Sequence, residues 1–193
     1  MNLRRLLLVS SLALAACSRP DEAPKFQSID ITGAAYAQRL DLPDVEGKPR
    51  SLADFAGKVV IVFFGFAQCP DVCPAALAEI AEARQRLGAD GAKVQPVFVT
   101  VDPERDTPEV LKAYVGNFGP DIVALRGSIE QTQAAAKEFK VFFAKVPGKE
   151  PGSYTIDHTA GMFVFDRAGK VRAFARYGGG VEPLVADLKL LMK

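Results

Sequence analysis

Apolar runs and amphipathic segments alternate through the middle of the chain. Residues 59–64 are continuously apolar and rich in β-branched and aromatic side chains, which is typical of a strand covered on both faces. Residues 75–87 follow with apolar positions at helical spacing, and residues 94–101 form a second apolar run. A strand, a helix and a second strand in this order predict a parallel sheet with a helix packed across it.

The rest of the chain extends this pattern. We expect a helix at 108–117, a short strand at 122–125, a helix at 129–139, an extended segment at 140–145, a hairpin of strands 162–165 and 171–176, and a helix at 183–192. Asp106 or Thr107 would cap the first of these helices, with Pro108 in its first turn. The expected fold class is therefore α/β, with a mixed sheet flanked by helices.

The N-terminal segment has a different character. Arg4 and Arg5 precede an apolar run, residues 6–16, that is too short to span a bilayer, which takes about 20 residues. The run ends in Leu-Ala-Ala-Cys at 14–17, which resembles a bacterial lipobox. We therefore expect a lipoprotein signal peptide at 1–16, lipidation of Cys17, and export to a membrane that faces the periplasm or the cell exterior. An ordinary cleaved signal with an incidental cysteine is the alternative.

Composition distinguishes a linker from a folded domain and limits the classes of function that the chain can have. Residues 17–35 contain two prolines, scattered charge and little periodicity, so we expect a flexible linker followed by one domain at 36–193. A net charge of +1 argues against a nucleic-acid partner, because phosphate binding needs a basic excess. One His and three Cys leave few soft or borderline ligands for a transition metal.

Two cysteines are candidates for the chemistry. Cys69 and Cys73 lie between the first buried strand and its helix, where open α/β sheets commonly place their sites. Pro74 should keep Cys73 out of helical conformation, so we expect both thiols in a loop that runs into the first helical turn. The positive end of that helix would favour thiolates. A structural disulfide or two inert thiols are the alternatives, although a disulfide would close only a very small loop.

Three motifs give the chain a resemblance to a known family. FGFAQCPDVCP at 64–74, VTVDPERDTP at 99–108 and DHT at 157–159 together resemble the Sco/SenC family of copper-binding assembly factors. The resemblance covers residues from about 36 to the C-terminus. It implies a thioredoxin-like fold, a membrane tether, copper held by Cys69, Cys73 and His158, and a role in building the dinuclear copper centre of cytochrome c oxidase.

The donor set itself agrees with this resemblance. Two thiolates and an imidazole suit both Cu(I) and Cu(II). Zinc would accept the same ligands but usually needs a fourth, for which Asp71 is a nearby candidate. We place His158 just ahead of the strand at 162–165, and we expect the polar stretch at 147–154 to be mobile, so that the His can approach and leave.

The acidic residues at 102, 104 and 106 do not form a calcium loop. An EF-hand that began at Asp102 would need Gly at its sixth position and Glu at its twelfth, where this chain has Thr107 and Ala113. Asp106 is also a candidate helix cap. For Asp71, Asp102 and Asp106 we leave open a role in supporting the metal ligands or in docking a partner.

Two functions remain. The first is a copper metallochaperone, not an enzyme, that passes copper to the copper-receiving subunit of cytochrome c oxidase. The second is an exported thiol-disulfide oxidoreductase that uses Cys69 and Cys73 as a redox pair to keep the cysteines of that copper site reduced. Other copper chaperones or thiol oxidoreductases are further expected partners. Thioredoxin-like reductases usually carry CxxC, and the extra residue here opens the pair for a metal, which favours the first function.

Overall fold

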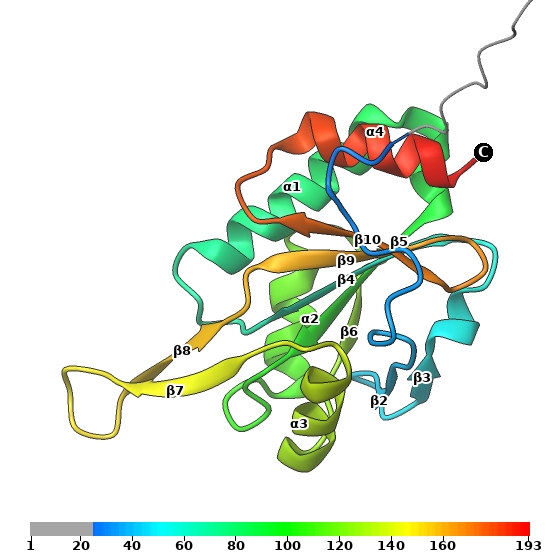
Figure 1. Ribbon diagram of the computed structural model, residues 1–193. Helices are drawn as coiled ribbons and strands as arrows, with labels where there is room; N and C mark the ends of the chain where they lie inside the picture. The colour runs from blue at the N-terminus through cyan, green and yellow to red at the C-terminus, as the bar shows by residue number, and fades with distance from the viewer. Residues whose placement is uncertain (1–24) are drawn as a thin grey trace, which may run out of the picture.

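The computed structural model describes residues 25–193. Its centre is a six-stranded mixed sheet (Figure 1). The strands lie in the order β1 (Ile29–Asp30), β10 (Val171–Arg176), β9 (Gly161–Phe165), β4 (Val59–Gly65), β5 (Val94–Thr100) and β6 (Val123–Leu125). Strands β4, β5 and β6 are parallel, whereas β9 runs antiparallel to β4, β10 to β9, and β1 to β10. The expected mixed α/β sheet is thus confirmed.

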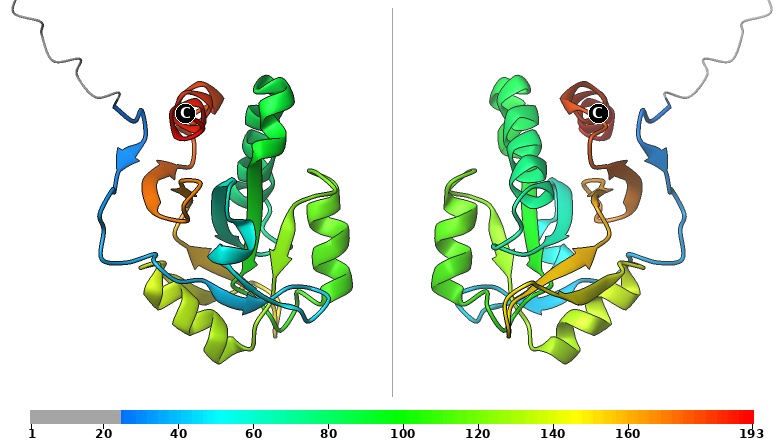
Figure 2. Two further views of the ribbon diagram at one scale, coloured as in Figure 1. Left: turned by 90° about the vertical axis from the view of Figure 1, so that its right-hand side faces the viewer. Right: turned by 90° about the vertical axis from the view of Figure 1, so that its left-hand side faces the viewer.

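Helices cover both faces of this sheet (Figures 1 and 2). Helices α1 (Val72–Arg86) and α4 (Val181–Leu191) pack against each other on one face. Helix α3 (Ile129–Glu138) lies on the opposite face, and α2 (Pro108–Gly116) packs beside β6. Two short 3-10 helices, η1 (Leu52–Phe55) and η2 (Gly88–Lys93), lead into β4 and β5. The sheet thus lies between layers of helices, and α1 begins near the carboxyl end of β4.

Two small hairpins lie outside the main sheet. One joins β2 (Asp41–Pro43) to β3 (Pro49–Ser51). The other joins β7 (Phe143–Pro147) to β8 (Tyr154–His158) and projects from the body as a ribbon of its own (Figure 1). Its tip is closed by a hydrogen bond from the Gly148 N–H to the Ser153 carbonyl (2.8 Å).

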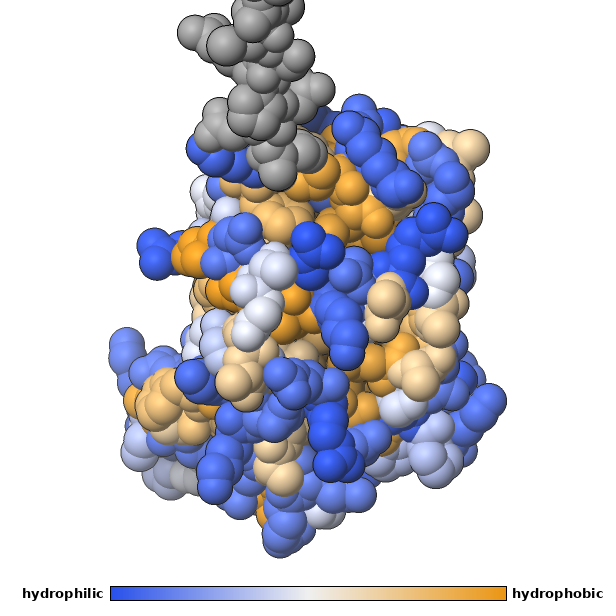
Figure 3. All heavy atoms as spheres, turned by 45° about the vertical axis from the view of Figure 1, so that its right-hand side comes forward, coloured by the Kyte–Doolittle hydropathy of each residue, from blue (hydrophilic) through white to orange (hydrophobic). Residues whose placement is uncertain are grey.

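The core is built from the continuously apolar strands. Every residue of β4 and β5 is buried, which explains why these runs show no alternation of polar and apolar residues. Successive phenylalanines of β4 point to opposite faces: Phe63 packs on Phe98, and Phe64 packs on Phe139 after α3. The face seen in Figure 3 carries hydrophilic and hydrophobic residues side by side.

The N-terminal segment joins the fold earlier than expected. Within the expected linker, β1 pairs with the edge strand β10, and the backbone N–H groups of Gln27 and Ser28 donate to the buried Asp187 carboxylate (2.7 and 2.9 Å). The expectation of a flexible linker as far as residue 35 is therefore wrong for these residues. The sequence does not reveal β1, because a two-residue strand is too short to leave a periodic pattern. The expected signal peptide, Cys17 and the first part of the linker lie outside the described residues. Within 25–193, no helix is long and apolar enough to cross a membrane.

Candidate metal centre

The two cysteines lie at the junction of β4 and α1. A turn after the strand, closed by a hydrogen bond from the Cys69 N–H to the Phe66 carbonyl (3.2 Å), presents Cys69 at the protein surface, where it is half-buried. Helix α1 begins at Val72, so Cys73 lies in its first turn and is fully buried. The expectation that Pro74 holds Cys73 out of the helix is wrong. A proline in the first turn costs little, since its missing N–H would have had no helical partner.

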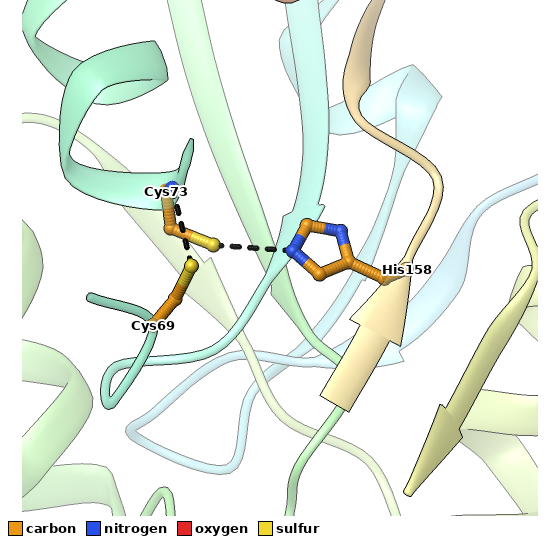
Figure 4. Close-up of side chains that lie close together, drawn as sticks. All are labelled: Cys69, Cys73 and His158. Atoms are coloured by element: carbon orange, nitrogen blue, oxygen red, sulfur yellow. Dashed lines mark hydrogen bonds between the residues drawn. The ribbon is translucent and has the colours of Figure 1, made fainter. Parts of the chain in front are cut away.

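His158 reaches the thiols from the end of β8. Its Nε2 lies 3.4 Å from the Cys73 Sγ (Figure 4). Its Nδ1 lies 3.1 Å from the Thr159 carbonyl oxygen. A carbonyl oxygen only accepts hydrogen bonds, so in the neutral imidazole Nδ1 carries the ring proton and the lone pair of Nε2 points at the cysteines. His158 is thus held in the tautomer that can bind a metal through Nε2.

These three side chains form a compact ligand group. The two Sγ atoms and the imidazole nitrogen all lie within 4.8 Å of one another. Metal–sulfur and metal–nitrogen bonds are about 2.0–2.3 Å long, so three ligands of one ion lie up to about 4 Å apart. Only a small contraction is needed to hold an ion. Among the described residues, this is the only such group of His, Cys, Asp and Glu side chains.

The protein makes the two thiols unequal. A hydrogen bond from Cys73, assisted by the Cys73 backbone N–H at 3.4 Å, lowers the pKa of Cys69 from 9.0 to about 5. The same hydrogen bond, together with burial, raises the pKa of Cys73 far above its ordinary value. At neutral pH the metal-free site therefore holds one thiolate and one thiol, and binding a metal to both sulfurs releases the Cys73 proton.

Aromatic rings and a groove surround the three candidate ligands. The rings of Phe63 and Phe66 pack edge-on against the His158 imidazole, with centroids 6.1 and 5.9 Å away. A groove of about 280 Å³ runs between the cysteine loop and β8, and Cys69 and His158 both line it. The site is thus apolar on its inner side and open to solvent at Cys69.

The acidic residues singled out in the sequence lie in different places. Asp71 is exposed at the start of α1 and is not part of the ligand group. Asp106 is buried, which raises its pKa, and it accepts hydrogen bonds from the Thr100 hydroxyl (2.5 Å) and the Ala67 N–H of the cysteine loop (3.1 Å). Thr107, not Asp106, caps α2 by accepting from the Val110 N–H.

Asp102 belongs to a network that the sequence did not reveal. Its buried carboxylate accepts a hydrogen bond from the Tyr154 hydroxyl (2.9 Å) and pairs with Arg105. Neither Arg105 nor Tyr154 is singled out by the sequence, and neither is Gly65, where an added Cβ would lie 2.7 Å from the Cys73 Sγ. Tyr154, Ile156 and His158 do repeat with a period of two, and this pattern could have revealed β8.

Fold and site together define a thioredoxin-like protein with a Cys₂His group at the carboxyl end of a central strand. The chain belongs to the SCO1/SenC family, whose sequence profile matches residues 30–193. This confirms the family and the fold that the three motifs predict.

Individual relatives agree with this assignment. The mouse mitochondrial SCO2 homolog is 35% identical over 200 residues, which cover 97% of this chain and 78% of that protein. Bradyrhizobium japonicum ScoI, solved with copper bound, is 38% identical, with a TM-score of 0.73 over 81% of this chain and 99% of that one. Apo Sco1 from Thermus thermophilus is 37% identical, with a TM-score of 0.75 over 86% and 97% of the two chains.

Proposed function

We propose that this protein is a copper metallochaperone that holds one copper ion through Cys69, Cys73 and His158. The observation that carries this proposal is the Cys₂His group itself, whose ligand atoms lie within 4.8 Å of one another beside an open groove. Thiolate and imidazole ligands suit copper in both oxidation states. Relatives such as B. japonicum ScoI, which has been solved with copper bound, support the same choice of metal.

We propose further that the copper is delivered to the copper-receiving subunit of cytochrome c oxidase. The half-buried Cys69 thiolate makes such a transfer chemically direct, since an incoming thiolate can replace one ligand at a time from the open side of the site. We expect no catalysed bond-making in this step, so the protein acts as a chaperone rather than as an enzyme.

Copper titration of the reduced protein under anaerobic conditions tests the binding step. We expect one tightly bound equivalent with thiolate-to-copper absorption. Binding should be lost in a Cys69→Ser/Cys73→Ser double variant and weakened in His158→Ala. Transfer is tested by mixing the loaded protein with the reduced copper-receiving subunit and following the absorption of the acceptor. Loose binding that does not depend on His158 would contradict the proposal.

Thiol-disulfide exchange is the second candidate. It is favoured by one observation, the low pKa of Cys69 beside a second cysteine that can resolve a mixed disulfide. In this case the protein would reduce the cysteines of the acceptor site. Rapid reduction of an oxidised acceptor by the copper-free protein, abolished by Cys73→Ser, would support it. Failure to reduce that acceptor would leave copper transfer as the remaining function.

We also propose that lipidated Cys17 anchors the protein to a membrane after export. The lipobox-like residues at 14–17 support this proposal. Mass spectrometry of the membrane-extracted protein should detect an acylated N-terminal cysteine. A Cys17→Ser variant should lack the acyl group, and an unmodified wild-type cysteine would contradict the proposal.

A further inference from the structure

The loop between β5 and α2 contacts both segments that carry the metal ligands. On one side, Asp106 accepts the hydrogen bond from the Ala67 N–H in the loop that leads to Cys69. On the other side, Asp102 and Arg105 contact Tyr154, the first residue of β8, which ends at His158. A single loop therefore connects the thiolate side of the site to the imidazole side.

Tyr154 is held at three points. Its hydroxyl donates to the Asp102 carboxylate (2.9 Å), and its backbone carbonyl accepts from the Arg105 Nη1 (2.7 Å). Its ring centroid lies 3.7 Å from the Arg105 guanidinium carbon, which is a close cation–π contact. The guanidinium is fixed in turn by its ion pair with Asp102, which is only 1% exposed. Hydroxyl, backbone and ring thus all receive a partner from the same loop.

Strand β8 needs this support because the main sheet does not provide it. Among the strands of residues 25–193, β7 and β8 pair only with each other, and a two-stranded ribbon is marginally stable by itself. Tyr154 and His158 are the two ends of a strand that is about 13 Å long between them. The contacts at Tyr154 hold the first residue of this strand against the body of the protein, and they thereby help to set where the imidazole at its other end lies.

Arg105 also reaches the imidazole by a second route. Its guanidinium carbon lies 5.8 Å from the centroid of the Phe66 ring, and that ring packs edge-on against His158. Phe66 belongs to the loop that leads to Cys69 and is 1% exposed. Arg105 therefore contacts both Phe66 and Tyr154. In the contacts described for residues 25–193, it touches none of the three proposed ligands.

We propose that Arg105 and Tyr154 are positioning residues for His158. They hold β8 so that the imidazole Nε2 meets the two sulfurs, and they thereby supply copper with its third ligand. This inference rests on the proposed copper site. It assigns a task to two residues that contribute no ligand atom.

Two conservative substitutions test the proposal. Arg105→Lys keeps the charge but loses the planar fork that contacts Asp102 and Tyr154 together. Tyr154→Phe removes only the hydroxyl and its bond to Asp102. Substitutions behind a metal ligand typically cost about 10–100-fold in metal affinity, and we expect a loss of this size for Cu(II) in each variant. The nitrogen hyperfine structure from His158 in the electron paramagnetic resonance spectrum should weaken or become heterogeneous.

A double-mutant cycle separates positioning from general loosening. In a His158→Ala background, Arg105→Lys should cause no further loss of Cu(II) affinity, because the ligand through which it acts is absent. Arg172→Lys is the matched control. Arg172 also forms an ion pair, with Asp166, and lies over an aromatic ring, that of Phe26, but it is on β10 and away from the site. We expect it to leave copper affinity unchanged.

The outcomes are distinguishable. Equal losses from Arg105→Lys with and without His158, or wild-type copper binding in both Arg105→Lys and Tyr154→Phe, would overturn the positioning role and leave the copper site intact. A wild-type protein that binds no copper would overturn the proposed function instead. If Arg105→Lys fails to fold by circular dichroism, Tyr154→Phe alone decides the matter, since it removes a single hydrogen bond.

Discussion

Gly65 at the end of β4 lies directly against the thiol of Cys73. A Cβ added to Gly65 would sit 2.7 Å from the Cys73 Sγ and 3.0 Å from the rings of Phe63 and Phe98. Carbon and sulfur atoms cannot approach so closely without displacement. Because Gly65 has no side chain, the first turn of α1 can pack against β4. This packing brings the Cys73 thiol next to the His158 imidazole.

Gly65→Ala should damage both the fold and the site. Forcing a methyl group into this buried contact is expected to lower the free energy of unfolding by about 1–3 kcal/mol. Displacement of Cys73 should also weaken copper binding. Denaturant unfolding with and without copper measures both effects. Gly116→Ala at the end of α2 is the control, since no atom of the part of the chain that the structure describes lies within 4 Å of its added Cβ. Equal behaviour of the two variants would refute this account of Gly65.

The low pKa of Cys69 predicts a specific pH dependence. Alkylation requires the thiolate, so the rate at Cys69 in the reduced, metal-free protein should rise through a midpoint near pH 5 and stay level from about pH 7. Cys73 should stay unmodified over this range, because its pKa is raised and its side chain is buried. Cys73→Ala removes the hydrogen bond that lowers the pKa, and it should move the midpoint up towards 9. A wild-type midpoint near 9 would show that this hydrogen bond does not form.

Thr107 should matter for stability and not for copper. Its hydroxyl caps α2 by accepting from the Val110 N–H (3.3 Å), and loss of such a cap costs about 0.5–2 kcal/mol. Thr107→Ala is expected to lower the unfolding midpoint in urea by a corresponding amount while copper affinity stays at the wild-type value. Thr107→Ser, which keeps the hydroxyl, should restore most of the stability. A large loss of copper affinity in Thr107→Ala would give this residue a role at the metal site.

Asp187 should fasten the N-terminal segment to α4. Its buried carboxylate accepts the backbone N–H groups of Gln27 and Ser28, and removing it leaves these donors without their partner. We expect Asp187→Ala to cost about 1–3 kcal/mol and to speed hydrogen exchange at both amides. Asp187→Asn, which keeps an acceptor oxygen, should have a smaller effect. Unchanged exchange at residues 27 and 28 would show that pairing of β1 with β10 suffices.

Copper should stiffen the β7–β8 hairpin. A third ligand bond would tie the end of β8 to the cysteine loop, so amides at 147–158 are expected to exchange hydrogen more slowly in the copper-loaded protein than in the copper-free one. Amides of β4, buried in the main sheet, serve as the internal reference. Unchanged protection across the hairpin would contradict the expectation that His158 approaches and leaves.

The sequence predicts the main sheet well because its signals are strong. The apolar runs that form β4 and β5 and the helical spacing after each of them depend on burial, which leaves a clear pattern. The candidate ligand residues could be named because a short motif carries two of them and a family resemblance adds His158. These three side chains lie within 4.8 Å of one another because β8 brings His158 back to the cysteine loop after β4. No local sequence pattern predicts that long-range contact.

The hairpin and the positioning loop could not be predicted in the same way. The stretch at 147–154 is polar because most of it is exposed, and its strand character appears only when Tyr154, Ile156 and His158 are recognised as one face. Arg105 resembles a surface charge in the sequence. Its role depends on the burial of its near neighbour Asp102 and on its contact with Tyr154, 49 residues away along the chain, and neither fact is encoded locally.

The proposed ligands are far apart along the chain, so copper binding by all three depends on folding. Cys73 and His158 are 85 residues apart, and the helices and strands between them must be in place before the imidazole can reach the sulfurs. A partly folded chain can offer copper the two thiols of Cys69 and Cys73 without the imidazole of His158. In the proposed copper site, the three-ligand complex can form only after the polypeptide has reached its native topology, so a partner that recognises this complex would receive metal only from folded molecules.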